Sequence, residues 1–165
     1  MLDEKIVVLM GSKSDFDFAS RIKQFLEKEK LPIECEFNVA SAHKTTKKLL
    51  TDLARYEKDY DKIVFITVAG LSDALSGVVA GYTRYPVIAC PPDSKEFGWA
   101  KAFSSIMTPK GVAVTFVSNP ENAALSAAKI LALSNPEIKK RVSAYRERLE
   151  KAVYQAARDV REKRK

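Results

Sequence analysis

The hydrophobic pattern of the chain alternates between short, continuous apolar runs and longer segments with a helical repeat. The first run, residues 6–10, contains no polar residue. Such a run is typical of a strand that is buried on both faces of a parallel sheet. In the segment that follows, residues 16–30, apolar side chains recur every three or four positions, and this spacing predicts a helix.

The same alternation continues as far as residue 133 and predicts strands and helices in turn. The predicted strands are 6–10, 33–39, 62–68, 86–90 and 111–117. The predicted helices that follow them are 16–30, 45–56, 73–81, 99–106 and 120–133. Strands that alternate with helices in this way form a parallel sheet through right-handed crossovers, with helices on both faces. The sequence therefore predicts a three-layer α/β fold.

A final long helix is predicted from about residue 136 to the end, because Asn135 and Pro136 are favourable residues for a helix start. Its apolar positions form one stripe, which consists of Ile138, Val142, Tyr145, Leu149, Val153, Ala156 and Val160. A five-stranded core can cover only part of so long a helix. We expect the remainder to pack on another subunit. A peripheral membrane helix is the less favoured alternative, since Lys and Arg are interleaved with Glu.

Length and composition fit one domain that spans residues 1–165, because 165 residues with 46% hydrophobic content can form a single sizeable core. The net charge of +7 has a local origin. Residues 139–165 hold 11 Lys and Arg against 4 Asp and Glu, which accounts for the whole excess. We interpret this charge as the solvated face of the last helix, and we expect no nucleic-acid partner.

The two cysteines, Cys35 and Cys90, lie in or beside apolar strand-like segments without the spacing of metal ligands. We expect them to be reduced core residues. The apolar run near the N-terminus is too short for a signal sequence or a membrane span. These two features favour a cytoplasmic protein that has no membrane partner.

The only histidine, His43, follows the second predicted strand. In an open α/β sheet, ligands bind at the carboxyl ends of the strands, and imidazole is well suited to proton transfer near neutral pH. This placement makes His43 the first candidate for catalysis. The alternative is a surface histidine that happens to precede a helix.

Two other predicted strands end in small and polar residues: Gly-Ser-Lys-Ser-Asp at 11–15 and Ala-Gly-Leu-Ser-Asp at 69–73. Neither contains a dinucleotide or P-loop fingerprint, which indicates a smaller ligand. Hydroxyls and helix N–H groups can bind an anion, and the Asp15 carboxylate suits a sugar diol. The alternatives are helix capping by Ser14 or Asp15 in the first segment and close helix packing in the second.

Joined to Ser-Ala-His at 41–43, the Gly-Ser-x-Ser-Asp pattern resembles the aminoimidazole ribonucleotide (AIR) carboxylase and mutase family of purine biosynthesis. The resemblance covers residues 11–15, 41–44, 69–77, 86–92, 104–111 and 122–133, with the last helix behind them. Lys44 and the Cys90-Pro91-Pro92 ending resemble the branch that carboxylates AIR directly with CO2. The mutase branch usually has Arg after the histidine and a second histidine where this chain has Ala74.

The sequence departs from the carboxylase branch at two places. That branch usually has Arg-Ser-Asn where this chain has Leu71-Ser72-Asp73, and Arg where it has Met107. Three hypotheses follow. A direct carboxylase is the first, a mutase that acts on N5-carboxyaminoimidazole ribonucleotide is the second, and a non-catalytic nucleotide-binding paralogue is the third.

The resemblance implies a flavodoxin-like fold, a homo-octamer with the last helix docked on neighbouring subunits, and a reaction of AIR with CO2 that needs no cofactor. It also implies that His43 transfers the proton. We expect no metal site, because one histidine and scattered carboxylates do not form one. The substrate-binding residues implied by the family are Gly11, Ser12, Ser14, Asp15, Ser41, Ala42, Lys44, Ala69, Gly70, Leu71, Ser72 and Asp73.

Overall fold

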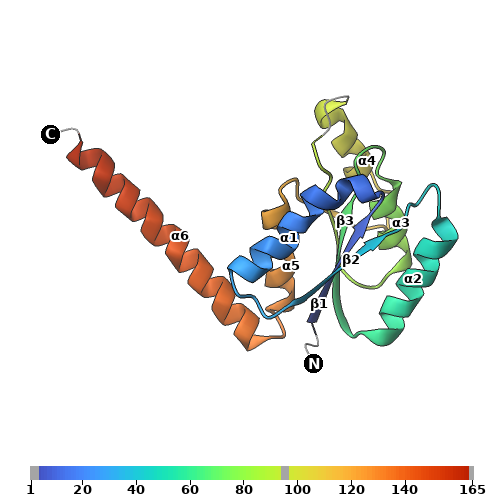
Figure 1. Ribbon diagram of the computed structural model, residues 1–165, viewed down its shortest axis with the longest axis horizontal. Coiled ribbons are helices and arrows are strands. Elements are labelled where there is room, and N and C mark those ends of the chain that lie inside the picture. The colour runs from blue at the N-terminus through green and yellow to red at the C-terminus, as the bar shows by residue number, and fades with distance from the viewer. Residues whose placement is uncertain (1–3, 94–96, 164–165) are drawn as a thin grey trace.

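A five-stranded parallel sheet forms the centre of the molecule, in a computed structural model that describes residues 4–93 and 97–163 (Figure 1). The strands lie in the order β2-β1-β3-β4-β5, which is the flavodoxin-like order. Their bounds are Glu4–Met10 for β1, Glu34–Val39 for β2, Lys62–Val68 for β3, Val87–Ala89 for β4 and Thr115–Phe116 for β5. The predicted three-layer α/β fold is confirmed.

Helices cover both faces of the sheet (Figure 1). Their bounds are Phe16–Lys28 for α1, Thr46–Asp59 for α2, Ala74–Tyr82 for α3, Ala102–Ile106 for α4, Pro120–Leu131 for α5 and Pro136–Glu162 for α6, with short 3-10 turns η1 at Lys13–Asp15 and η2 at Gly98–Lys101. Helices α1 and α5 and the start of α6 pack on one face, and α2 and α3 pack on the other. Among the described residues, none of the helices has the length and apolarity needed to cross a membrane.

Strand β1 explains why the first apolar run lacks polar residues. Ile6, Val8 and Met10 belong to the hydrophobic cluster on the α1 and α5 face. The residues between them, Val7 and Leu9, belong to the cluster on the α2 and α3 face. Since successive side chains of a strand point to opposite faces, a strand covered on both sides needs an apolar residue at every position.

Several predicted bounds differ from the structure. The fifth predicted strand, 111–117, shortens to β5, and its first predicted residue, Gly111, has a φ of +94° and belongs to the preceding turn. The first predicted helix, 16–30, ends two residues early, since Lys30 adopts a φ of +52° that terminates it. The predicted helix at 99–106 divides into η2 and α4. The last two residues of the predicted final helix, 164 and 165, lie outside the described residues.

A charged cluster at the start of β1 was not predicted. The side chain of Lys5 is 1% exposed, and its Nζ lies 2.8 Å from Glu34 and 2.7 Å from Glu36. It also donates a hydrogen bond to the hydroxyl of Tyr60 at 2.7 Å. Burial lowers the pKa of Lys5, but these partners outweigh that effect and raise it above its usual value. The ammonium is therefore kept charged inside the protein.

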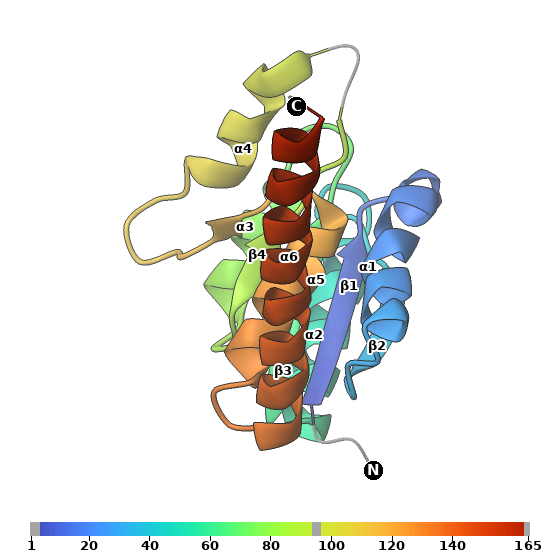
Figure 2. The same ribbon diagram turned by 90° about the vertical axis from the view of Figure 1, so that its left-hand side faces the viewer.

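Helix α6 is packed on the molecule only over its first turns. Ile138 and Val142 are buried, and the ring of Tyr145 lies 5.4 Å from that of Phe25 in an edge-to-face arrangement. Beyond the ion pair of Arg148 with Glu29, the helix leaves the body of the molecule (Figure 1), and in the view of Figure 2 it lies in front of the other elements. The rest of the apolar stripe is exposed, with Val153 at 69%. The core therefore covers only part of α6, as predicted.

We predict that Ile138→Ala lowers the free energy of unfolding by about 2–5 kcal/mol, because it leaves a cavity in the main core. The control, Leu133→Ala, removes a side chain that is 89% exposed and changes that free energy by less than about 0.5 kcal/mol. Urea denaturation of both variants measures the difference. Equal stability of the two variants would show that α6 does not pack on the sheet.

Candidate active site

The candidate site lies where β1, β2 and β3 end together. Met10 pairs with Val39 on one side and with Val68 on the other. The next row across the sheet therefore consists of Gly11, Ala40 and Ala69, which are all small residues. Two hydrogen bonds hold this row: Gly11 N–H donates to Val68 O at 2.9 Å, and Ala40 N–H donates to Met10 O at 3.0 Å. Small side chains at the switch point between β1 and β3 leave room for a ligand.

The loop after β1 is held by a capping box. Ser12 Oγ accepts the N–H of Ser14 at 3.3 Å, and one oxygen of Asp15 accepts the N–H of Ser12 at 3.0 Å. The hydroxyl of Ser14 also donates to Ser12 Oγ at 3.0 Å. Ser12 is therefore the N-cap of η1, and Asp15 is its capping-box partner. The alternative drawn from the sequence was capping by Ser14 or Asp15, and Asp15 makes no side-chain cap hydrogen bond at the start of α1. The capping uses only Oδ2 of the Asp15 carboxylate.

The other oxygen of Asp15 faces the loop after β3. A Cβ atom added to Gly70 would lie 2.9 Å from Asp15 Oδ1, closer than a Cβ approaches such an atom without displacement. Glycine at position 70 therefore permits the two loops to meet. Burial raises the pKa of Asp15, while the N–H of Ser12 and the charge of Lys101 oppose that effect.

The loop after β2 is a hydrogen-bonded turn that presents His43. Ser41 N–H donates to Thr45 Oγ1 at 2.9 Å, and Lys44 N–H donates to Ser41 Oγ at 3.2 Å. Ala42 O accepts the hydroxyl of Thr46. These bonds fix the backbone, whereas the side chains of His43 and Lys44 are exposed. The imidazole is thus accessible to a ligand at the sheet edge.

In the loop after β3, Asp73 has a structural role. Its side chain is buried, and Oδ1 accepts the N–H of Ser76 at 2.9 Å as the N-cap of α3. Oδ2 accepts the hydroxyls of Ser76 and Ser105, the latter at 2.6 Å. The Asp73 N–H donates to Ser104 Oγ at 3.0 Å. Asp73 therefore links α3 to α4, while Leu71 and Ser72 before it are exposed.

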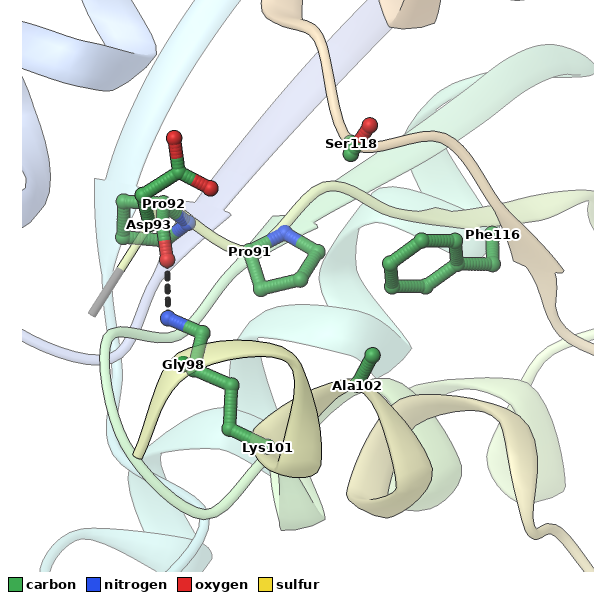
Figure 3. A pocket seen from close by; sticks show the side chains of 8 residues that line it. All are labelled: Pro91, Pro92, Asp93, Gly98, Lys101, Ala102, Phe116 and Ser118. Atoms are coloured by element: carbon green, nitrogen blue, oxygen red, sulfur yellow. Dashed lines mark hydrogen bonds between the residues drawn. The ribbon is translucent and has the colours of Figure 1, made fainter. Parts of the chain in front are cut away.

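Lys101 is a site residue that the sequence did not indicate. Its Nζ donates to the carbonyl of Gly70 at 3.1 Å and also to that of Pro92. Figure 3 shows this side chain reaching from η2 to the loop after β4. Burial lowers the pKa of Lys101, and the charges of Asp93 and Asp15 act in the opposite direction. No spacing or motif marks this residue, because its partners are two backbone carbonyls from distant segments.

A cavity of about 270 Å³ lies beside Lys101, on the β4 and β5 side of the sheet edge. Its lining residues are Pro91, Pro92, Asp93, Gly98, Lys101, Ala102, Phe116 and Ser118 (Figure 3). This lining contains none of the site residues predicted from the sequence. The structure thus brings Asp15 close to Gly70, directs the side chain of Asp73 into the fold, and places the cavity beside the segments that follow β4 and β5.

Comparison with known proteins identifies the family. The AIR carboxylase family matches residues 5–152. A phosphoribosylaminoimidazole carboxylase of Archaeoglobus fulgidus is 45% identical over 157 residues, which are 95% of this chain and 85% of that protein. The chain belongs to the AIR carboxylase family. The family predicted from the sequence is therefore confirmed, and with it membership of an enzyme family of purine biosynthesis.

Two further relatives are informative, one about the fold of this member of the AIR carboxylase family and the other about its reaction. The crystal structure of Treponema denticola PurE superposes with a TM-score of 0.88 at 38% identity, covering 92% of this chain and 95% of that one. An N5-carboxyaminoimidazole ribonucleotide mutase of Methanocaldococcus jannaschii is 40% identical over 159 residues, which are 95% of this chain and 98% of that protein. Both branches of the family thus include proteins similar to this chain.

We predict that Asp73→Ala lowers the free energy of unfolding by about 2–4 kcal/mol, because it removes the α3 cap and leaves buried hydroxyls without an acceptor. Ser72→Ala, at the exposed neighbouring position, serves as the control and changes it by less than about 0.5 kcal/mol. Thermal and urea unfolding measure both. If Asp73→Ala is as stable as the control, the linking role assigned to Asp73 is wrong.

Proposed function

We propose that the protein carboxylates AIR at C4 with CO2 in a reversible reaction. We propose further that the loops at the carboxyl ends of β1, β2 and β3 bind the nucleotide. The observation that carries this proposal is that the strands before the three family motifs end in one row, with Asp15 Oδ1 close to Gly70 and the His43 turn directly after the neighbouring strand. The names of the most similar relatives support the reaction.

The reaction requires the formation of one C–C bond and the transfer of one proton. The enamine electron pair at C4 of AIR attacks the carbon of CO2, which forms the C–C bond and leaves a carboxylate. C4 then carries both this carboxylate and its original hydrogen. His43 removes that proton, and the released electron pair restores the aromatic imidazole ring of the substrate. In decarboxylation, the protonated His43 returns the proton to C4 and CO2 leaves.

The loop geometry supports a distinct role for each group. Asp15 Oδ1 is the carboxylate oxygen that capping leaves available, and we assign it to the ribose hydroxyls. We assign Ser12 and Ser14 to the same end of the ligand as Asp15. Ser41 Oγ accepts an N–H from its own turn, so its hydroxyl hydrogen can be donated to the phosphate, beside the charged Lys44.

The base and CO2 are assigned to the backbone of the loop after β3. Gly70 O and Asp73 N–H already have partners, in Lys101 and Ser104 respectively. Among the described residues, the N–H groups of Leu71 and Ser72 donate no hydrogen bond, and we assign them to the ligand. The exposure of these two residues fits that assignment, and Gly11, Ala42 and Ala69 provide space around the ring.

A mutase is the second candidate, because the Methanocaldococcus jannaschii relative named as one covers nearly the whole chain. The two functions differ in substrate. Purified protein is incubated with AIR and bicarbonate, and separately with the N5-carboxy isomer. We expect C4-carboxylated product from AIR. Product from the isomer alone would establish the mutase, and product from neither would indicate a binding protein without catalysis.

We predict that His43→Asn reduces turnover of AIR by about 10²–10⁴-fold, because asparagine cannot exchange the C4 proton. Nucleotide affinity and the urea unfolding midpoint should stay close to those of the wild type, since the His43 side chain is exposed. Steady-state kinetics and calorimetric titration with AIR measure these quantities. A variant that retains most of its activity would remove His43 from the mechanism.

We further infer that residues 1–165 act as one domain and that copies assemble through α6, as a homo-octamer according to the family resemblance. The exposed part of the stripe supports this assembly, with Leu149 at 50%, Val153 at 69% and Val160 at 58%. Burying such side chains contributes about 1.5–3 kcal/mol each. The free cysteines Cys35 and Cys90 fit a reducing compartment, which supports the cytoplasm as the place of action.

We predict that Val153→Glu combined with Val160→Glu dissociates the oligomer, because it places two carboxylates in the apolar stripe. Lys151→Glu, on the opposite side of the helix by its 3.6-residue repeat, is the control and should leave the assembly intact. Light scattering measures the mass of each. A monomeric wild-type protein, or an intact oligomer in the double variant, would refute the proposed role of α6.

A further inference from the structure

Lys101 occupies a position that no family motif explains. It ends η2, and its ammonium donates to Gly70 O after β3 and to Pro92 O after β4. A lysine that bonds two backbone carbonyls from different loops acts as a clamp between them. Removing it leaves two carbonyls without that donor and leaves the loops free to move apart.

The Gly70 loop is also the loop that meets Asp15. An added Cβ at Gly70 would lie 2.9 Å from Asp15 Oδ1 and 3.9 Å from Pro92 Cγ. Gly70 therefore lies close to both Asp15 and Pro92. The ammonium of Lys101 holds the carbonyl of this same residue, so its position determines how closely Gly70 approaches Asp15.

The charges around Lys101 connect it to the same carboxylate. Three carboxylates act on the ammonium, from Asp93 after β4, Asp15 after β1 and Asp73 after β3. In return, the charge of Lys101 lowers the pKa of Asp15, against the opposing effect of burial. Loss of the ammonium therefore raises the pKa of Asp15 and favours its neutral form, which is the poorer acceptor for hydroxyl groups.

We propose that Lys101 is a positioning residue for the nucleotide site, which clamps the loop after β3 to the loop after β4 and thereby sets the place and charge of Asp15. The role in catalysis rests on the function proposed above. The coupling between Lys101 and Asp15 does not depend on that function. Lys101 itself touches no reacting atom in this account, and it acts through Gly70 and Asp15.

Lys101→Met tests this role, because methionine keeps much of the side-chain volume and removes the charge and the donor. We expect KM for AIR to rise about tenfold or more, the effect of a weakened charged hydrogen bond, while kcat changes less than about threefold. The acid limb of the KM profile should move to higher pH. Lys101→Arg, which retains the charge and the donors, should restore most of the affinity.

The control is Lys110→Met, which removes an exposed lysine from the turn that follows α4 and should leave KM and its pH profile unchanged. If Lys101 had only a structural role, Lys101→Met would lower the free energy of unfolding without moving the acid limb of the KM profile. Equal KM values in Lys101→Met and the control would overturn the proposal. So would an unmoved acid limb or a failure of arginine to restore affinity.

A measurement without turnover separates this inference from the proposed function. The chemical shift of the Asp15 carboxyl carbon is followed by NMR as a function of pH in the wild type, Lys101→Met and Lys110→Met. Its resonance is identified by its loss in Asp15→Asn. We expect a higher pKa of Asp15 in Lys101→Met alone. An unchanged value would refute the coupling, even if the enzyme carboxylates AIR. A raised value in a protein that does not act on AIR would retain the coupling and reject only the function.

Discussion

The parallel pairing of β1 with β2 on one side and β3 on the other is the constraint on which the site depends. Met10 pairs with both Val39 and Val68, so the three strands end in the same row. Three loops from distant parts of the sequence therefore start side by side. Because β1 is buried on both faces, a shift in its register would move its apolar side chains out of the packed layers. The hydrophobic core thus fixes the register, and the register fixes the site.

Folding and function use different atoms of the same loops. In the loop after β1, Asp15 Oδ2 completes the capping box while Oδ1 faces Gly70. In the loop after β2, backbone and hydroxyl groups close the turn, and the imidazole of His43 is left exposed. Capping and ligand binding are therefore compatible explanations of these motifs. In Asp73, by contrast, internal hydrogen bonds occupy both carboxylate oxygens.

The layers could be predicted because they depend on local patterns, whereas the flavodoxin-like strand order was implied only by the family resemblance. An uninterrupted apolar run such as residues 6–10 indicates a doubly buried strand, and helical spacing in residues 16–30 indicates its crossover helix. Local backbone geometry limited how accurately the ends of the strands and helices could be predicted. The positive φ of Lys30 ends one helix early, and that of Gly111 places the first residue of a predicted strand in a turn. Single-sequence patterns contain little information about such dihedral angles.

The candidate site was predictable only where a motif carries its chemistry within a few residues. Ser12, Asp15 and His43 belong to such motifs. Lys101 does not, since it bonds carbonyls that lie 31 and 9 residues away. The ion pairs of the buried Lys5 with Glu34 and Glu36 were missed for the same reason. These contacts arise when distant segments meet, and residue types along the chain do not encode them.

A crystal structure of the protein with the carboxylated nucleotide bound would show whether the nucleotide lies where β1, β2 and β3 end. We expect ribose hydroxyls within hydrogen-bonding distance of Asp15 Oδ1 and the His43 imidazole about 3 Å from the reacting part of the substrate. The base should lie over the row formed by Gly11, Ala40 and Ala69. A nucleotide seated instead in the cavity beside Phe116, with His43 away from it, would show that the loops after β1, β2 and β3 are not the nucleotide site.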